Sequence, residues 1–390
     1  MDKIDNLLIR GVEKIYPSKE ELEKVLRSGK KLRLYQGFDP SMPNLHLGNF
    51  VGLMKLRQFQ KMGHEVIFLV GDFTGMIGDP TDKSATRKML TREETVSNSQ
   101  TWKEQVSRVL NFEGDNPVKL MFNSEWLDKI SFKDLIGYTS NFTFQQLIER
   151  DMFQKRLKED KPIYLHEFLY PVAQAIDCVI MDVDLEIGGS DQTFNMLTGR
   201  TLMKALKDKE KYVLTTKLLV DAEGNKAGKT TGNALFLDST PENFYGGIMS
   251  FPDEVIALSF ELLTEVDLEG NEEKIKADPM GEKKRLAFEV VKLLWGKESA
   301  QKAQDVFERT FQKRGVPELE VKKINSLNLE DALTELGLAS SKGEAKRIIQ
   351  QGGVDIEEQK IIDPNFKLPS NKDILIKVGK TKFVKIRSCI

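Results

Sequence analysis

The chain has 390 residues, with 58 Lys and Arg against 60 Asp and Glu, and 40% of its residues are hydrophobic. This length allows two or three domains with full cores, and the near-neutral charge excludes a uniformly basic surface. Two cysteines and three histidines exclude a disulfide framework and a multi-histidine metal site, so we expect no protein-bound metal. No apolar run approaches the ~20 residues that span a bilayer, and the N-terminus lacks a signal-peptide core. We therefore expect a cytoplasmic protein that does not contact membranes.

The first half of the chain alternates strand and helix patterns. Residues 31–35 predict a strand, residues 48–62 a helix, and the unbroken apolar run at 66–70 a strand buried on both faces. Strands in this order indicate an α/β fold with a parallel sheet, in which ligands bind beyond the carboxyl ends of the strands. Further strands are expected at 118–122, 183–187 and 212–220.

The pattern then becomes helical, with helices expected at 283–294 and 300–311 and a boundary at 315–317. Beyond it we expect short helices at 329–336 and 342–350, a turn into a strand at 352–356, and a hairpin formed by 374–378 and 382–386. Residues 321–390 contain 13 Lys and Arg against 9 Asp and Glu, a net charge of +4, whereas the rest of the chain carries −6. The C-terminal segment is therefore the better candidate for a polyanion contact.

A tetrapeptide at the start of the 48–62 helix, His46-Leu47-Gly48-Asn49, directs an imidazole, a glycine backbone and an amide towards helical N–H groups. Such a position suits phosphate, because unpaired N–H groups and the helix dipole favour an anion. The alternative is an ordinary helix start with a surface histidine.

Two loops carry cations beside small residues. Lys226-Ala227-Gly228-Lys229-Thr230 places two lysines on a flexible loop, where they can follow charge that develops on phosphate oxygens. The glycine-rich segment 75–83, which continues to Arg87, adds Asp79 and Lys83. The alternative for both is a solvated surface loop, although loops as long as the second are often functional.

Tyr170, Gln174 and Asp177 fall at positions i, i+4 and i+7 of an expected helix and so share one face. A phenol, an amide and a carboxylate among apolar neighbours are costly to bury unless something polar binds them. The alternative is a polar stripe that faces solvent.

Together and in this order, these segments resemble the bacterial-type tyrosyl-tRNA synthetases over essentially the whole chain. Residues 46–49 resemble the HIGH signature of class I synthetases, and residues 226–230 resemble a degenerate KMSKS signature. The resemblance implies a Rossmann-like catalytic domain at 1–235, a helical tRNA-contacting domain at 236–318, and a small α+β RNA-binding domain at 319–390 that resembles part of a ribosomal protein. It also implies ligation of L-tyrosine to tRNA(Tyr) through tyrosyl-adenylate, with Mg²⁺ entering on ATP, by a homodimer. The sequence itself suggests an interface helix at 142–157, with Phe144, Leu147 and Ile148 on one side.

The resemblance also assigns residues, position by position. It implies tyrosine binding by Tyr35, Asp79, Tyr170, Gln174, Asp177 and Gln192. It implies ATP binding by Gly37, Asp39, His46, Gly48, Gly189, Asp191 and Lys229. The implied catalytic residues are His46, Asn49, Lys83, Arg87, Lys226, Lys229 and Thr230, and the implied RNA contacts are Lys342, Lys346, Arg347, Lys380 and Lys382.

Two positions depart from the family pattern. Asn49 replaces the usual final histidine of the first signature, and Ala227-Gly228 replaces the Met-Ser pair of the second. An amide still donates hydrogen bonds, and small residues keep a loop flexible. A tryptophanyl-tRNA synthetase and a catalytically silent RNA-binding paralogue stay open as alternatives, and only Asn49 favours the second.

Overall fold

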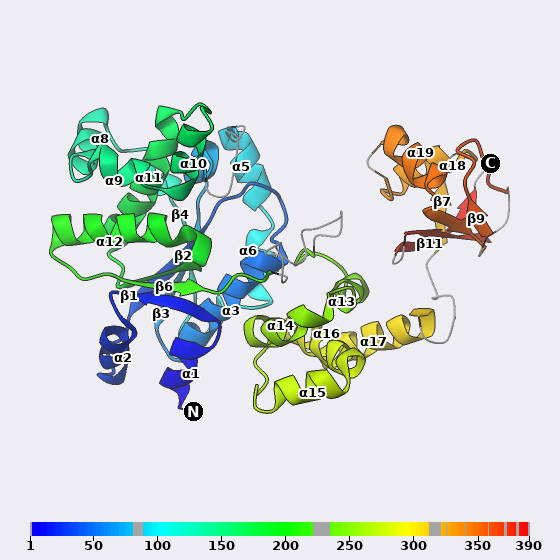
Figure 1. The fold of residues 1–390 in the computed structure, drawn as a ribbon, viewed down its shortest axis with the longest axis horizontal. Helices are drawn as coiled ribbons and strands as arrows, with labels where there is room; N and C mark the ends of the chain where they lie inside the picture. The colour runs from blue at the N-terminus through cyan, green and yellow to red at the C-terminus, as the bar shows by residue number, and fades with distance from the viewer. Residues whose placement is uncertain are drawn as a thin grey trace. The chain divides into compact units, whose positions relative to one another are not determined.

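A computed structural model describes residues 2–80, 89–220, 235–311, 321–324, 326–339, 341–357, 359–369, 373–379 and 382–388. The chain forms two compact units, Met1–Gln304 and Asp305–Ile390, whose boundary falls within one helix (Figure 1). The predicted boundaries of the three domains stay predictions. Among the described residues, no helix is long and apolar enough to cross a membrane.

The first unit is built on a six-stranded sheet with the order β1-β6-β5-β2-β3-β4. Five strands run parallel, and β1 pairs with β6 in the antiparallel sense. The strands are β1 (Val12–Tyr16), β2 (Arg33–Phe38), β3 (Glu65–Val70), β4 (Lys119–Phe122), β5 (Leu185–Gly189) and β6 (Tyr212–Thr216).

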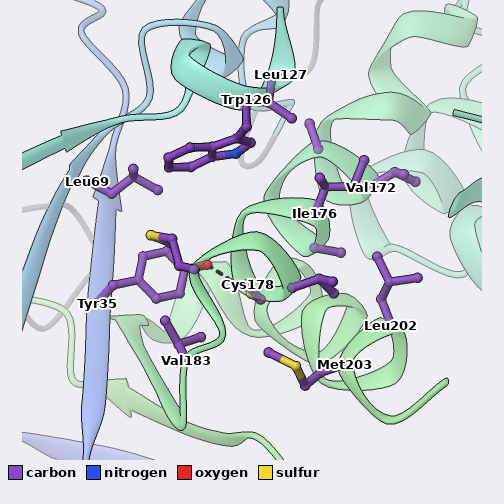
Figure 2. Packing of buried hydrophobic residues seen from close by; sticks show 14 of the residues in the cluster. Tyr35, Leu69, Trp126, Leu127, Val172, Ile176, Cys178, Val183, Leu202 and Met203 are labelled. Atoms are coloured by element: carbon purple, nitrogen blue, oxygen red, sulfur yellow. Dashed lines mark hydrogen bonds between the residues drawn. The ribbon is translucent and has the colours of Figure 1, made fainter. Parts of the chain in front are cut away.

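Helices cover both faces of this sheet. Alternation along β2 points Tyr35 to one face, where it joins a buried cluster with residues of α11 (Leu165–Met181) and α12 (Thr193–Lys207) (Figure 2). The next residue, Gln36, points to the other face, where its side chain lies against Gly52 of α3 (Leu47–Lys61). The side chains of β2 therefore point towards the helices on both faces of the sheet.

The remaining helices of the first unit fall into three groups. At the N-terminus are α1 (Lys3–Ile9) and α2 (Lys19–Arg27). Between β3 and α11 lie α4 (Thr74–Ile77), α5 (Arg92–Ser99), α6 (Trp102–Ser107), α7 (Ser124–Leu127), α8 (Phe132–Thr139), α9 (Phe144–Ile148) and α10 (Asp151–Lys158). After the sheet come α13 (Pro241–Met249), α14 (Ile256–Leu263), α15 (Asn271–Ala277), α16 (Pro279–Trp295) and α17 (Lys297–Phe311), the last of which enters the second unit.

The second unit contains a five-stranded sheet, β7-β11-β10-β8-β9, in which β7 is parallel to β11 and the other pairs are antiparallel. Its elements are β7 (Val321–Ile324), α18 (Leu329–Glu335), α19 (Lys342–Gln350), β8 (Val354–Ile356), β9 (Gln359–Ile361), β10 (Asp373–Val378) and β11 (Lys382–Ser388). Its buried cluster draws only on residues between Ile324 and Ile386, so this unit has a core of its own.

The predicted strands and helices are confirmed, with ends that differ by a few residues, and two predictions need correction. The strand expected at 212–220 ends at Thr216. The helix expected at 142–157 is two helices, α9 and α10, because Arg150 breaks it with ψ at 126°. The side chain of Arg150 turns inward to pair with Asp79. The sequence analysis also missed β1, in which only Ile15 is buried and no apolar alternation is visible.

Candidate active site

A cavity of about 480 Å³ lies at the carboxyl ends of β2, β3 and β5. Every predicted tyrosine-binding or ATP-binding residue that the structure describes lines it, and so does Asn49. These residues are Tyr35, Gly37, Asp39, His46, Gly48, Asn49, Asp79, Tyr170, Gln174, Asp177, Gly189, Asp191 and Gln192. Residues more than a hundred positions apart in the sequence thus line one cavity, as expected for the strand ends of a parallel sheet.

The predicted cations Lys83, Arg87, Lys226 and Lys229, together with Thr230, lie outside the described residues. The segments on either side of the lysine-rich loop are described. Leu219 lines the cavity, while the carbonyl of Leu235 accepts a hydrogen bond of 2.9 Å from the amide of Leu47. The described residues that flank positions 221–234 therefore lie at the site, and Leu235 contacts the residue next to His46.

The first turn of α3 forms one end of the cavity and is capped by its own side chains. His46 Nδ1 accepts a hydrogen bond from the amide of Asn49 at 3.3 Å, and Asn49 Oδ1 accepts one from the amide of His46 at 2.9 Å. A Cβ at Gly48 would lie 2.9 Å from His46 Cε1, so the imidazole occupies this position only because residue 48 is glycine. Since Nδ1 is an acceptor, the ring proton of neutral His46 is on Nε2.

Asp177 also lines the cavity, and its side chain is buried. Its two oxygens accept hydrogen bonds from Trp126 Nε1 at 2.7 Å and Asn123 Nδ2 at 3.1 Å. Burial raises the pKa of the Asp177 carboxyl well above its ordinary value, and these two bonds offset only part of that effect. Burial likewise raises the pKa of Tyr35, whose hydroxyl is therefore protonated near neutral pH.

Two further carboxylates hold neighbouring side chains in place. Asp39 accepts hydrogen bonds from Tyr170 Oη at 2.8 Å and Thr74 Oγ1 at 2.7 Å. Asp79 accepts one from Gln192 Nε2 at 2.6 Å and forms an ion pair of 3.0 Å with the buried guanidinium of Arg150. Two pairs of predicted residues, Asp39 with Tyr170 and Asp79 with Gln192, are thus joined by hydrogen bonds.

The sequence analysis missed five residues of this network. They are Thr74, Asn123, Trp126, Arg150 and Glu186, the last of which accepts hydrogen bonds from Tyr35 and Gln174. Asn123 and Trp126 come directly after β4, so the rule that ligands meet strand ends could have found them. Glu186 is a charged residue within an apolar strand, which is itself a signal. Arg150 offered no local signal.

The predicted RNA contacts belong to the second unit. Lys346 and Arg347 are exposed on α19, and Lys342 at the start of that helix pairs with Asp331 at 2.5 Å. Lys380 and the side chain of Lys382 lie outside the described part of the chain.

The fold and the cavity together define an α/β protein with a cavity at the carboxyl ends of a parallel sheet, which is where folds of this kind bind ligands. Residues 27–312 match the family model described as tRNA synthetases class I (W and Y), and residues 307–386 match the SYY-like C-terminal domain of tyrosine–tRNA ligase. The chain therefore belongs to the class I tRNA synthetases, within the bacterial-type tyrosyl-tRNA synthetases.

Individual relatives agree with this placement. The chain is 43% identical over 374 residues to the tyrosine–tRNA ligase of Aquifex aeolicus, with 95% of each chain covered. It is 42% identical over 389 residues to that of Thermotoga maritima, with 97% of this chain and 96% of the relative covered. A C-terminally truncated mitochondrial tyrosyl-tRNA synthetase of Coccidioides posadasii superposes with a TM-score of 0.65 at 25% identity, over 78% of this chain and 91% of that one.

Proposed function

We propose that this chain is a tyrosine–tRNA ligase. It joins L-tyrosine to ATP to form tyrosyl-adenylate and pyrophosphate, and then transfers tyrosine to the 3′-terminal adenosine of tRNA(Tyr). The observation that carries the proposal is the single cavity that joins the capped start of α3 to the buried Tyr35 and Asp177. Relatives named tyrosine–tRNA ligase, more than 40% identical over nearly the whole chain, support the same activity.

In the first step the tyrosine carboxylate attacks the α-phosphorus of ATP, so no protein nucleophile is needed. Alignment of the two substrates and stabilisation of charge on the phosphate oxygens supply the rate enhancement. His46 would donate its Nε2 proton to those oxygens, because Nδ1 is held as an acceptor by the amide of Asn49. Since Asn49 uses Oδ1 in the capping box, its NH₂ group is the one that would donate to phosphate or ribose.

At the other end of the cavity, Asp177 and Tyr35 would bind the phenolic hydroxyl of the substrate. Asp79, Tyr170 and Gln174 would hold its ammonium group, for which the carboxylate of Asp79 supplies the charge. Phenylalanine would leave buried polar groups without a partner, and this loss discriminates against it more strongly than the missing oxygen alone. Gln192 would support this site by holding Asp79.

The ATP end of the site requires cations for the departing pyrophosphate. Lys83, Arg87, Lys226, Lys229 and Thr230 would clasp it, and Mg²⁺ would enter bound to the phosphates of ATP. The contacts of Leu219 and Leu235 support this role, because these described residues precede and follow the lysine-rich segment in the chain and both lie at the site. Gly37, Asp39, Gly48, Gly189 and Asp191 would line the nucleotide site.

The second unit would bind tRNA. Lys346 and Arg347 supply exposed charge on α19, and Lys342, Lys380 and Lys382 would add phosphate contacts that weaken with salt. A homodimer is also proposed, through exposed apolar side chains on α8 to α11. An enzyme that charges tRNA works where tRNA and ATP are available, so we place it in the cytoplasm.

The decisive experiment is the exchange of labelled pyrophosphate into ATP in the presence of single amino acids. Exchange that depends on tyrosine, followed by charging of tRNA(Tyr), is the expected result. Exchange that depends on tryptophan would instead identify a tryptophanyl-tRNA synthetase. No exchange with any amino acid, together with retained RNA binding, would identify a catalytically silent paralogue and would overturn the proposal.

A further inference from the structure

A buried polar cluster adjoins the cavity, and two of its members, Tyr35 and Glu186, help to line it. It consists of Glu186 on β5, Lys211 just before β6, Cys178 on α11 and the hydroxyl of Tyr35, and each residue is at most 1% exposed. Figure 2 shows Tyr35 and Cys178 meeting between the sheet and α11. The proposed binding and catalytic roles do not involve Glu186, Lys211 or Cys178. A buried charge pair is a poor source of stability, so this one calls for another explanation.

The two oxygens of Glu186 have different neighbours. Oε1 accepts hydrogen bonds from Tyr35 Oη at 2.5 Å and Gln174 Nε2 at 2.8 Å, and both of these side chains line the cavity. Oε2 forms a close ion pair with Lys211 and lies 3.4 Å from Cys178 Sγ. One carboxylate therefore links two ligand-facing side chains to an anchor in the core.

The backbone around this cluster fixes its geometry. Glu186 and Tyr35 are in register on adjacent parallel strands, and Lys211 Nζ also donates to the carbonyl of Met196 at 2.9 Å. A Cβ on Gly199 of α12 would lie 2.7 Å from Lys211 Nζ and 2.6 Å from Cys178 Sγ. Glycine is less favourable than alanine within a helix, and here it leaves room for the ion pair.

The charges of the pair are complementary. Burial by itself opposes the charged form of Lys211, but its ion pair with Glu186 acts in the other direction, and the pKa of Lys211 is raised above the ordinary value. Burial raises the pKa of the Cys178 thiol to about 12, so this group is not a thiolate. Lys211 Nζ and Glu186 Oε2 form an ion pair, and the carboxylate of such a pair only accepts hydrogen bonds.

We propose that Glu186, anchored by Lys211, is a positioning residue that directs the Tyr35 hydroxyl proton away from the cavity. A tyrosine hydroxyl carries one proton, and in this arrangement Glu186 takes it. The Tyr35 oxygen then offers the cavity a lone pair that accepts the hydroxyl proton of a bound phenol, while the Asp177 carboxyl, whose pKa burial raises well above its ordinary value, donates to the phenol oxygen. Phenylalanine offers neither group a partner. The same carboxylate fixes the amide of Gln174. This inference rests on the proposed activation of tyrosine.

The test replaces the pair by uncharged groups of similar shape, Glu186→Gln together with Lys211→Met, so that no unpaired charge remains. Tyrosine-dependent and phenylalanine-dependent pyrophosphate exchange are measured for both proteins. We expect the ratio of kcat/KM for tyrosine over phenylalanine to fall by about ten- to a hundredfold, as for loss of a hydrogen bond to a charged group. The loss should appear in the KM for tyrosine, while the KM for ATP stays unchanged.

Arg156 and Glu167 provide a matched control, because they form a second buried ion pair in the same unit and do not line the cavity. Arg156→Met with Glu167→Gln should leave the ratio unchanged. An unchanged ratio in the folded Glu186–Lys211 variant, or an equal fall in the control, overturns the proposal. Wild-type protein without tyrosine-dependent exchange would instead refute the proposed function.

If the double variant does not fold, a measurement on the wild-type enzyme still tests the proposal. An oxygen that only accepts requires a donor on the para position of the substrate. We expect 4-aminophenylalanine to be activated about tenfold or more better than 4-fluorophenylalanine, which has no proton to donate there. Equal activation of the two analogues overturns the proposal.

Discussion

Trp126 donates its indole N–H to Asp177 Oδ1 at 2.7 Å, from the short helix α7 that follows β4. The bond joins the segment that follows β4 to α11, the helix that carries three of the predicted tyrosine ligands. It also favours the ionised form of Asp177, which burial opposes. Trp126 therefore acts on the tyrosine site without belonging to any predicted motif.

We expect Trp126→Phe to raise the KM for tyrosine by about fivefold or more, because the lost hydrogen bond to a buried acceptor contributes about 1 to 3 kcal/mol. The KM for ATP should not change. Pyrophosphate exchange measures both. Trp102→Phe is the control. It removes an indole hydrogen bond to the carbonyl of Pro43, which, unlike Asp177, does not line the cavity. Equal tyrosine KM values in the two variants would contradict this role.

Asp184 contributes stability that depends on pH. Its carboxylate accepts the amide of Arg33 at 2.9 Å and pairs with Lys30 at 3.0 Å and Lys209 at 3.3 Å. Burial alone would raise the pKa of Asp184, but these partners hold it below the ordinary value. The stabilisation is therefore complete above about pH 4, the ordinary value, and is lost as the pH falls through the lowered folded value.

We expect Asp184→Asn to reduce the free energy of unfolding by about 1 to 3 kcal/mol at pH 7, with the deficit shrinking below about pH 4. Urea unfolding of both proteins between about pH 3 and 7 measures it. The control is Asp182→Asn, because Asp182 is more exposed and has a φ of 50°, which asparagine tolerates. A deficit that stays constant across this range would argue against an ionised Asp184.

The parts of the fold that could be predicted from sequence are those with local causes. The buried strand at 66–70 and the helix face shared by Tyr170, Gln174 and Asp177 follow from periodicity, and the structure confirms both. The contacts of Arg150 and Lys211 could not be predicted in this way. Each is a cation whose partner is more than 20 positions away, and only the packing of α10 and β6 brings the two together.

Removal of the second unit should separate the two steps of the reaction. A protein that ends at residue 320 loses the whole buried cluster between Ile324 and Ile386 but none of the cavity-lining residues. We expect it to keep tyrosine-dependent exchange and to lose most tRNA charging, because phosphate contacts dominate affinity for RNA. Loss of exchange as well would assign the second unit a structural role in adenylate formation.

Exposed apolar side chains gather on α8, α9, α10 and the start of α11, which adjoin one another in Figure 1. They include Phe132 at 78% exposure and Leu165 at 83%, together with Ile136, Phe144 and Leu157. A large exposed apolar patch on a folded protein marks an interaction site. A second copy of the chain is the partner that fits the proposed homodimer.

We therefore expect Phe132→Glu to convert the dimer to a monomer in sedimentation velocity experiments, because two buried carboxylates would face each other across a two-fold interface. The fold should survive, since the side chain is mostly exposed in the isolated chain. Ile362→Glu is the matched control, an equally drastic change at an exposed apolar residue of the second unit. A variant at position 132 that sediments as the wild type does would place the dimer interface elsewhere, and a monomeric wild type would refute the dimer itself.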